Sequence, residues 1–455
     1  MKLFRTKSEV PHQDTELKRC LNSFDLILLG IGAIIGAGIF VLTGIAAATK
    51  AGPAVVLSYA LAGLACSFAA LCYAELAASV GGAGSAYNYA YVGIGELIAW
   101  IIGWDLILEY GVSVGAVAIG WSGYVNDALN VFGLQIPPIL LKTPSEGGFI
   151  NLAAVFIVLF LSCIVAIGVK LSARVNAVIV VIKLLTITLF ISVAIFNVHF
   201  SNWVPFMPFG WKGMVEGASL VFFAFIGFDA VSTAAEECVN PQRNMTIGII
   251  GSLAICTTIY MVVAALLTGI VPYSTLNVKS PVAHAILAIG HESISGFIAL
   301  GAIAGLTSVM LIFIYGFSRI LYSMSRDGLL PKVFSEVHHK THTPVKTILF
   351  CGVMMSLMAG FFSMHTVAEL VNIGTLAAFV IVCISVLILR KTKPDLHRPF
   401  KTPLFPAVPI LGIISCSYLM LNLPWVTWLR FVIWMALGLI VYFCYSYKNS
   451  RIHQS

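Results

Sequence analysis

About twelve long apolar runs, separated by short polar segments, constrain the fold of this chain more than any other feature. Each run is long enough to cross the hydrocarbon core of a bilayer, which takes about 20 helical residues. Of the 455 residues, 59% are hydrophobic and 10% are charged, and the charges gather between the runs. The pattern predicts an all-α polytopic membrane protein. The runs cover residues 25–48, 53–79, 95–126, 150–168, 173–196, 213–236, 244–271, 293–322, 345–363, 366–389, 404–422 and 427–447.

The placement of the basic residues explains the net charge of +7. When the segments between runs are assigned alternately from an inside N-terminus, 20 of the 26 Lys and Arg residues fall inside and five fall outside. This asymmetry follows the positive-inside rule and predicts that both termini are cytoplasmic. It favours a multi-pass protein of the cytoplasmic membrane, with lipids as neighbours, and counts against a nucleic-acid partner.

Glycines interrupt two of the runs near their centres. Gly36-Ala37-Gly38 lies in the middle of the first run, and Gly227 lies in the middle of the run 213–236. Glycine weakens a helix, and an unwound backbone inside a bilayer is tolerated only where it is buried in protein or lines a cavity. We therefore predict two broken helices whose freed backbone groups bind a ligand. The alternative is that these small residues serve close helix packing.

The positions of the two breaks divide the chain into similar halves. Residues 25–196 and 213–389 each contain five runs, and the first run of each half is broken. Because five is an odd number, the second half is predicted to be inverted relative to the first, which gives a 5+5 inverted repeat. The remaining predicted units are a cytoplasmic tail over 1–22, two additional helices over 404–447 and a second tail over 448–455.

Two charged residues inside the runs are candidates for proton coupling. Lys183 is the one basic residue well inside a run, where insertion of a charge is unfavourable by about 2.5–3.5 kcal/mol. A titratable amine beside a ligand site would let protonation bias the conformation. Glu109 lies deep in the third run and shares a helix face with Asp105, four residues earlier. The alternatives are a static ion pair, with Glu109 as one partner for Lys183, and a purely structural carboxylate.

Catalytic, metal and cofactor motifs are not indicated. Ten cysteines show no CxxC spacing, and most lie within apolar runs, which favours packing. His338, His339 and His342 lack an accompanying set of Cys or carboxylate ligands. The glycine-rich stretch 81–85 is not followed by Lys-Ser or Lys-Thr, so it does not match a phosphate-binding loop. We expect no enzyme activity, no metal site and no cofactor.

Five sequence motifs are distinctive as a set, and they lie at residues 30–40, 103–111, 222–237, 240–243 and 325–331. Together they resemble the motifs of the amino acid–polyamine–organocation superfamily, and within it the bacterial twelve-helix form of the cationic amino acid transporter family. The resemblance covers nearly the whole chain. It implies the leucine-transporter-like fold with broken helices 1 and 6, and uptake of an L-amino acid driven by protons.

The resemblance also implies roles for individual residues. The substrate carboxylate would be held by the backbone amides near Ala37 and Gly38, with the backbone of Gly36 beside them. Lys183 would replace the sodium ion that other relatives bind between the first, fifth and eighth helices. The residues expected to hold the α-ammonium, mostly through backbone carbonyls, are Ile34, Phe223, Ala224 and Ile226.

The choice of substrate stays open between two classes. The apolar segment Met310–Ile314 favours a small or neutral amino acid, whereas the family name favours a cationic one, for which Glu109 is relevant. Many relatives have Thr or Ser where this chain has Ala37, so a hydroxyl is missing there. The balance favours a neutral substrate. Amino acid exchange and amino acid sensing without transport also stay open as functions, and the sequence does not decide whether a small accessory subunit binds.

Overall fold

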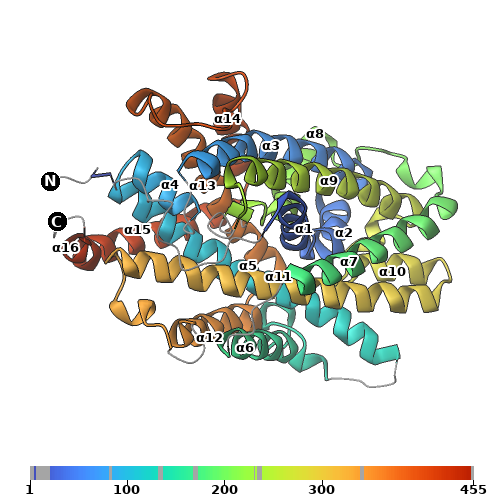
Figure 1. Ribbon diagram of the computed structural model, residues 1–455. Helices are drawn as coiled ribbons and strands as arrows, with labels where there is room; N and C mark the ends of the chain where they lie inside the picture. Colours follow the sequence, from blue (N-terminus) through green and yellow to red (C-terminus); the bar gives the residue numbers. More distant parts are fainter. Residues whose placement is uncertain are drawn as a thin grey trace.

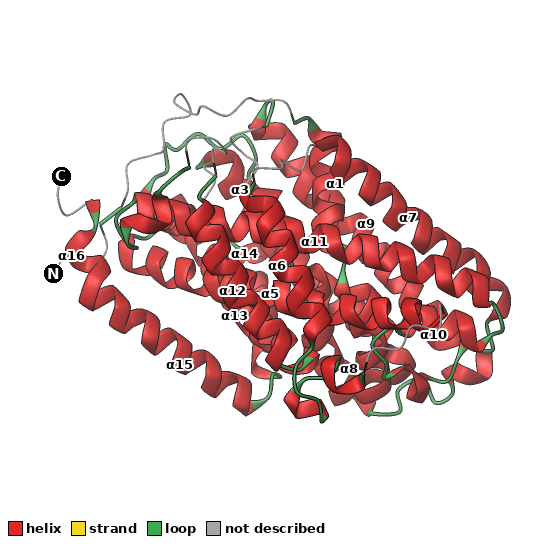
Figure 2. Cartoon of the chain, turned by 90° about the horizontal axis from the view of Figure 1, so that it is seen from below, coloured by secondary structure: helices red, strands yellow, loops and turns green. Residues whose placement is uncertain are grey.

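The computed structural model is built from helices that run mostly between two opposite ends of the molecule (Figure 1). It describes residues 5–6, 21–80, 85–131, 137–167, 173–229, 231–232, 238–338 and 343–451. Within these ranges no β-strand occurs, and one isolated parallel bridge pairs Leu21 with Cys238. Loops gather toward the ends of the helices (Figure 2). The predicted all-α class is therefore confirmed for the described part of the chain.

Each predicted run coincides with a helix or with a series of short helices. The long elements are α1 (Ser23–Ile34), α3 (Val55–Ser79), α5 (Glu96–Val131), α6 (Leu152–Ala166), α7 (Ala173–Ala194), α8 (Gly210–Val221), α9 (Pro241–Ile270), α11 (Glu292–Arg326), α12 (Val345–Phe361), α13 (Met364–Thr392), α14 (Ala407–Leu421) and α15 (Trp425–Val441). The short elements are η1 (Gly38–Leu42), α2 (Thr43–Ala46), η2 (Ala47–Ala51), η3 (Gly52–Ala54), α4 (Ala86–Gly93), η4 (Pro138–Leu140), η5 (Pro144–Glu146), η6 (Ile195–Asn197), η7 (Phe200–Trp203), η8 (Phe222–Phe225), η10 (Tyr273–Leu276), α10 (Pro281–Ala288), η11 (Lys332–Ser335), η12 (Tyr442–Ser446) and α16 (Tyr447–Asn449).

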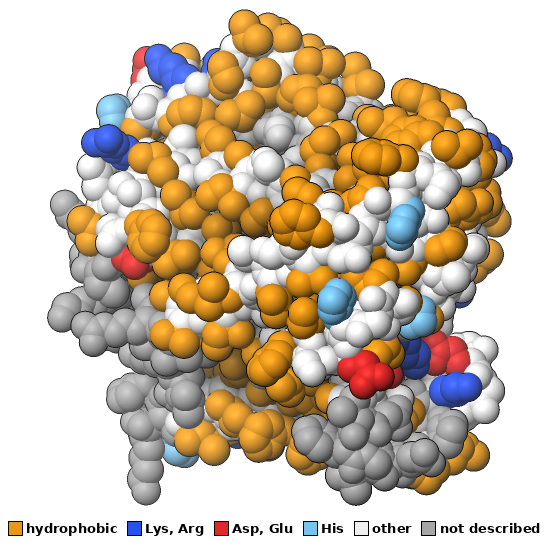
Figure 3. All heavy atoms as spheres, turned by 90° about the vertical axis from the view of Figure 1, so that its right-hand side faces the viewer, with side chains coloured by type: hydrophobic (Ala, Val, Ile, Leu, Met, Phe, Trp, Pro, Cys, Tyr) orange, Lys and Arg blue, Asp and Glu red, His pale blue; other side chains and the backbone are white. Residues whose placement is uncertain are grey.

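The apolar character of these helices fits a membrane environment. In the described residues, seven helical segments are long and apolar enough to cross a membrane, and α6, α12 and α14 are shorter apolar helices. In the most apolar stretch of Ser23–Ser79, 83% of the residues are buried, compared with 22% in that of Trp425–Asn449. The first broken helix therefore lies at the centre of the molecule and α15 at its edge. Charged side chains are sparse on the end opposite the termini (Figure 3).

Both predicted interruptions are present. Helix α1 ends at Ile34, Ile35 is extended (φ −74°, ψ 103°), and helical structure resumes as the π-helix η1 at Gly38. Helix α8 ends at Val221 and tightens into the 3-10 helix η8, after which Ile226 is extended. Gly227 has a φ of +117°, which a residue with a side chain rarely adopts. The glycines near both run centres thus mark true breaks in the helices.

The two ends of the chain meet at the start of α5. The Glu96 N–H donates to the Arg5 carbonyl (3.0 Å), and the Ser450 hydroxyl donates to the Glu96 carboxylate (2.5 Å). Tyr442 donates to the same carboxylate (3.0 Å). Both termini accordingly lie at one end of the molecule (Figure 1).

A buried carboxylate joins α3, α13 and the connection between α13 and α14. Glu75 is 2% exposed and accepts two hydrogen bonds from the Arg390 guanidinium of α13, at 2.9 and 2.7 Å. It also accepts from the Thr402 N–H (2.7 Å), and the Arg398 Nε lies 3.5 Å from it. Thr402 belongs to the connection that leads to α14. A paired, bidentate carboxylate is the arrangement in which a buried charge is tolerated.

Replacing this carboxylate is expected to destabilise the protein. In Glu75→Gln the two arginines lose their shared negative charge, and breaking a buried ion pair costs about 3–5 kcal/mol. The matched control is Glu336→Gln, because Glu336 and Lys346 form an ion pair (2.6 Å) whose side chains are 53% and 68% exposed. An exposed pair contributes about 0–1 kcal/mol. Thermal unfolding in detergent should show a large drop for Glu75→Gln alone; equal drops in both variants would contradict this account.

Candidate functional site

Side chains from other helices satisfy the carbonyl groups that the first break frees. Lys183 of α7 is fully buried, and its Nζ donates to the carbonyls of Gly32 (2.6 Å) and Ile35 (2.8 Å). A buried backbone carbonyl without a partner is costly, and a bilayer core supplies no water to replace it. The amine therefore stabilises the end of α1 at the point where the helix stops.

Lys183 lies where three helices approach each other closely. Its aliphatic stem packs against Gly305 of α11, where an added Cβ would lie 3.1 Å from the lysine Cγ. The amine is thus enclosed by α1, α7 and α11, which are the first, fifth and eighth predicted runs. Among the described residues no ion pair joins Lys183 to Glu109. The static Lys183–Glu109 pair is therefore wrong, because the amine binds backbone carbonyls instead.

Tyrosine hydroxyls bind further carbonyls around the breaks, and sequence reasoning missed these residues. Tyr260 of α9 lies 2.7 Å from the Ile34 carbonyl and 2.8 Å from the Ala224 carbonyl. Tyr59 of α3 donates to the Gly38 carbonyl (3.2 Å), and Tyr124 of α5 donates to the Phe40 carbonyl (2.6 Å). A buried tyrosine usually finds a partner for its O–H. The sequence contained one indication of this role: each tyrosine lies within an apolar run and carries a hydroxyl that needs a hydrogen-bond partner.

The two broken segments touch each other directly. An added Cβ on Gly38 would lie 2.3 Å from the Cα of Ala224, and an added Cβ on Gly227 would lie 3.0 Å from the carbonyl of Ala33. Residues far apart in the sequence are therefore in contact at the centre of the bundle. All the residues predicted to bind substrate are buried here: Ile34, Gly36, Ala37, Gly38, Phe223, Ala224 and Ile226.

The backbone around this contact presents groups of both polarities. The helix that resumes after the first break begins with N–H groups that have no acceptor within their own helix, and its dipole favours negative charge there. Helix α8 ends on the opposite side, where carbonyls near Ala224 are freed from the regular helical pattern. Such a pair of ends is suited to a ligand that carries one negative and one positive group.

A group of acidic residues lies beside the second break. Glu109 of α5 neighbours both Asp229 and Asp105, and all three residues are at most 2% exposed. Tyr110 donates to the Asp229 carboxylate (3.1 Å), and the Thr375 hydroxyl lies near Glu109. Among the described residues no basic side chain forms an ion pair with Glu109 or Asp105. An ionised carboxylate without a counter-charge is costly in a medium of low dielectric.

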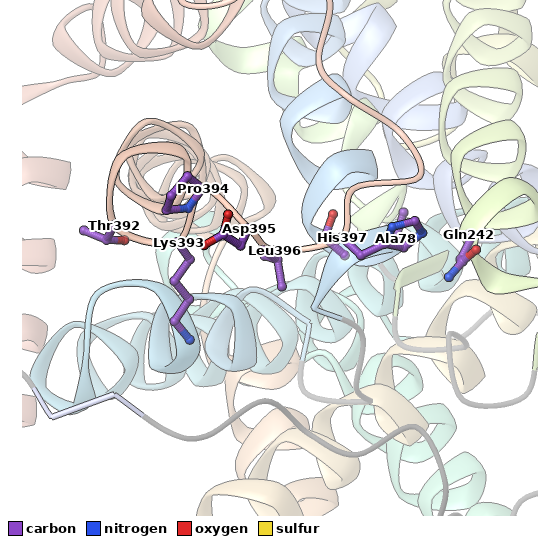
Figure 4. A pocket seen from close by; sticks show the side chains of 9 residues that line it. Ala78, Gln242, Thr392, Lys393, Pro394, Asp395, Leu396 and His397 are labelled. Carbon is purple, nitrogen blue, oxygen red and sulfur yellow. The ribbon is translucent and has the colours of Figure 1, made fainter.

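Several residues considered above for metal or phosphate binding lie away from the breaks or outside the described residues. His339, His342 and the glycines at positions 81, 82 and 84 are outside them. In the part of the chain that is described, no group of three or more His, Cys, Asp and Glu residues is arranged to hold a metal ion. An open pocket at the ends of α3 and α13 is lined by Ala78, Gln242 and residues 392–397 (Figure 4). It contains none of the predicted site residues.

A family model and several known proteins match this chain over most of its length. A family model described as "Amino acid permease" matches residues 21–445. The methylthioribose transporter of Bacillus subtilis is 49% identical over 99% of both chains. The branched-chain amino acid permease BcaP of the same organism is 48% identical over 97% of this chain and 96% of its own length. The vacuolar cationic amino acid transporter 4 of Arabidopsis thaliana is 37% identical over 86% of this chain and 66% of its own.

The contact between the breaks predicts different sensitivities at two neighbouring glycines. In Gly38→Ala the new methyl group collides with the backbone of Ala224, which has no room to yield. In Gly36→Ala it lies 3.1 Å from a methyl of the Val309 side chain, which can adjust. Overpacking costs about 1–3 kcal/mol. Thermal unfolding in detergent should therefore show a clear loss of stability in Gly38→Ala and a small one in Gly36→Ala; the reverse order would rule out the direct contact.

Proposed function

The chain belongs to the amino acid permease family, and we propose that it takes up a neutral L-amino acid together with protons, by alternating access. As a member of this family it is a multi-pass transporter of the cell membrane and not an enzyme. The observation that carries the proposal is the direct approach of two interrupted helices at the centre of the bundle. Broken helices that meet near the bilayer midplane are typical of transporter substrate sites.

In this proposal the backbone recognises the parts that all amino acids share. The amides near Ala37 and Gly38, with Gly36 beside them, bind the substrate carboxylate. The carbonyls around Ile34 and Ala224 bind the α-ammonium, together with those of Phe223 and Ile226. Support comes from the opposite polarity of the two helix ends and from their contact through Gly38 and Ala224.

Lys183 is proposed as the proton-coupling residue. A protonated amine makes charge-assisted hydrogen bonds, which are stronger than those of a neutral amine. The bonds to Gly32 and Ile35 would therefore hold the first break firmly while Lys183 is charged. Loss of the proton toward the cytoplasm would loosen the end of α1 and favour substrate release. Glu109, beside the second break, is proposed as a further proton-carrying group.

The proposed cycle needs an arrangement that supports alternating access. We propose that residues 25–196 and 213–389 form two inverted five-helix repeats that rock about the site, with 404–447 as an appended pair. The termini would be cytoplasmic, with the tails 1–22 and 448–455 on that side. The meeting of both chain ends at Glu96 and the excess of basic residues in alternate segments support this orientation.

The preference for a neutral substrate rests on the apolar side chains near the breaks. Phe223 and Ile226 are buried there, and Phe313 of α11 packs against Tyr110 with ring centres 5.2 Å apart. The relative named as a branched-chain amino acid permease agrees with this class. A cationic amino acid is the second candidate, because one oxygen each of Glu109 and Asp105 has no hydrogen-bond partner among the described residues and could accept from a basic side chain. Amino acid exchange would use the same site.

The substrate is tested by thermal stabilisation of the purified protein against all twenty amino acids and methylthioribose, at acid and neutral pH. A ligand at 100 times its Kd adds about 2.7 kcal/mol to the stability of the state that binds it. Stabilisation by neutral amino acids, stronger at acid pH, is expected. Stabilisation by Arg, Lys or ornithine would replace the neutral class with the cationic one. A response to methylthioribose alone, or no response, would overturn the amino acid proposal.

The coupling role of Lys183 is tested with Lys183→Ala in proteoliposomes. Accumulation driven by a proton gradient is expected to fall to background, because the amine proposed to carry the coupling proton is removed. Thr186→Val, one turn further along α7, is the matched control, since the Thr186 hydroxyl bonds only within its own helix (2.8 Å, to Ile182). Substrate-dependent thermal stabilisation in the same variants separates loss of coupling from loss of the site. Gradient-driven accumulation by Lys183→Ala would refute the role.

A further inference from the structure

Tyr260 connects the two broken segments of the bundle. It lies on α9, an unbroken helix of 30 residues, and its side chain is fully buried. Its hydroxyl oxygen is 2.7 Å from the Ile34 carbonyl oxygen and 2.8 Å from the Ala224 carbonyl oxygen. One side chain on a continuous helix therefore reaches one carbonyl from each break.

The single O–H of Tyr260 cannot satisfy both carbonyls at once. A phenol has one O–H to donate, so at any moment Tyr260 donates to one carbonyl only. The other carbonyl then faces an oxygen lone pair at hydrogen-bond distance with no hydrogen between the two atoms. Three oxygens thus converge with a single proton among them. Buried polar groups are normally satisfied, so this place is suited to a ligand that brings N–H donors.

A primary ammonium has the matching chemistry, because it brings three N–H donors, a positive charge and no acceptor. The nearby hydroxyl of Tyr59 offers a contrast within the same cluster of rings. The hydroxyls of Tyr59 and Thr43 both lie within hydrogen-bond distance of the Gly38 carbonyl, and they are 2.7 Å from each other. Two O–H protons are therefore available there. The shortage of donors is a feature of the Tyr260 position.

We propose that Tyr260 is a specificity-determining residue, whose hydroxyl oxygen binds the substrate α-ammonium together with the carbonyls of Ile34 and Ala224. This inference rests on the proposed function and adds a requirement to it. With Tyr260 donating to one carbonyl, its lone pair and the second carbonyl accept from the ammonium, and a further carbonyl accepts the third N–H. The site then selects primary amines over N-methylated amines and over α-hydroxy acids, which offer fewer donors.

The ring of Tyr260 is positioned independently of its hydroxyl. It packs against Tyr59 and Phe225, with ring centres 5.3 and 5.4 Å away. Tyr260→Phe therefore removes one oxygen and keeps the aromatic packing. Tyr59→Phe is the matched control, because it removes a hydroxyl from the same cluster at a point where Thr43 remains to serve the carbonyl.

The experiment measures Kd values by thermal stabilisation for wild type, Tyr260→Phe and Tyr59→Phe, with L-leucine, N-methyl-L-leucine and (S)-2-hydroxy-4-methylpentanoate as probes. Wild type is expected to bind L-leucine at least tenfold more tightly than either analogue. Tyr260→Phe should weaken L-leucine binding about tenfold, as loss of one hydrogen bond to a charged group implies, and should shrink the preference for the primary amine to about two- to threefold. Tyr59→Phe should keep that preference.

Each part of the experiment can overturn the inference separately from the proposed function. Wild type that binds L-leucine and N-methyl-L-leucine equally would refute the inference even if Tyr260→Phe did not fold. An unchanged preference in a folded Tyr260→Phe, or the same change in Tyr59→Phe, would also refute it while leaving the transporter proposal intact. Wild type that no neutral amino acid stabilises would overturn the neutral substrate of the proposed function, and this inference with it.

Discussion

A backbone that leaves the helical conformation inside an apolar environment must find hydrogen-bond partners within the protein, and the rest of this structure depends on that constraint. Carbonyls at and next to the first break are bound by Lys183, Tyr260, Tyr59 and Tyr124, which come from four different helices. These helices must therefore converge on α1. The high burial within Ser23–Ser79, which contains the first break, fits the same requirement.

The polar groups that stabilise the breaks include Lys183, to which we assign the coupling role. Basic and acidic groups lie apart: Lys183 binds carbonyls at the first break, while Glu109 lies near Asp229 at the second. The pieces that would bind substrate are backbone groups, which suits a ligand recognised by its carboxylate and ammonium. Glycines at close contacts, such as Gly38 against Ala224, let the backbones of the two broken segments approach each other closely.

Much of the architecture and part of the site could be predicted from the sequence. The helices occupy the predicted runs, the breaks lie beside Gly36 and at Gly227, and the buried lysine lies at the first of them. The suggested ion pair between Lys183 and Glu109 was wrong. Both residues were recognised from their position inside apolar runs, but a charge in a run reveals only that it needs a partner, not which partner it has.

The sequence by itself determined where the chain crosses the membrane environment and where two crossings are interrupted, because run length, glycine content and charge placement act locally. Tertiary structure alone decided which groups meet. Tyr260 reaches both breaks, and Glu109 neighbours Asp229 instead of Lys183, because these contacts depend on how each helix is rotated and how closely it packs against helices distant in sequence. No local pattern in the chain encodes that rotation.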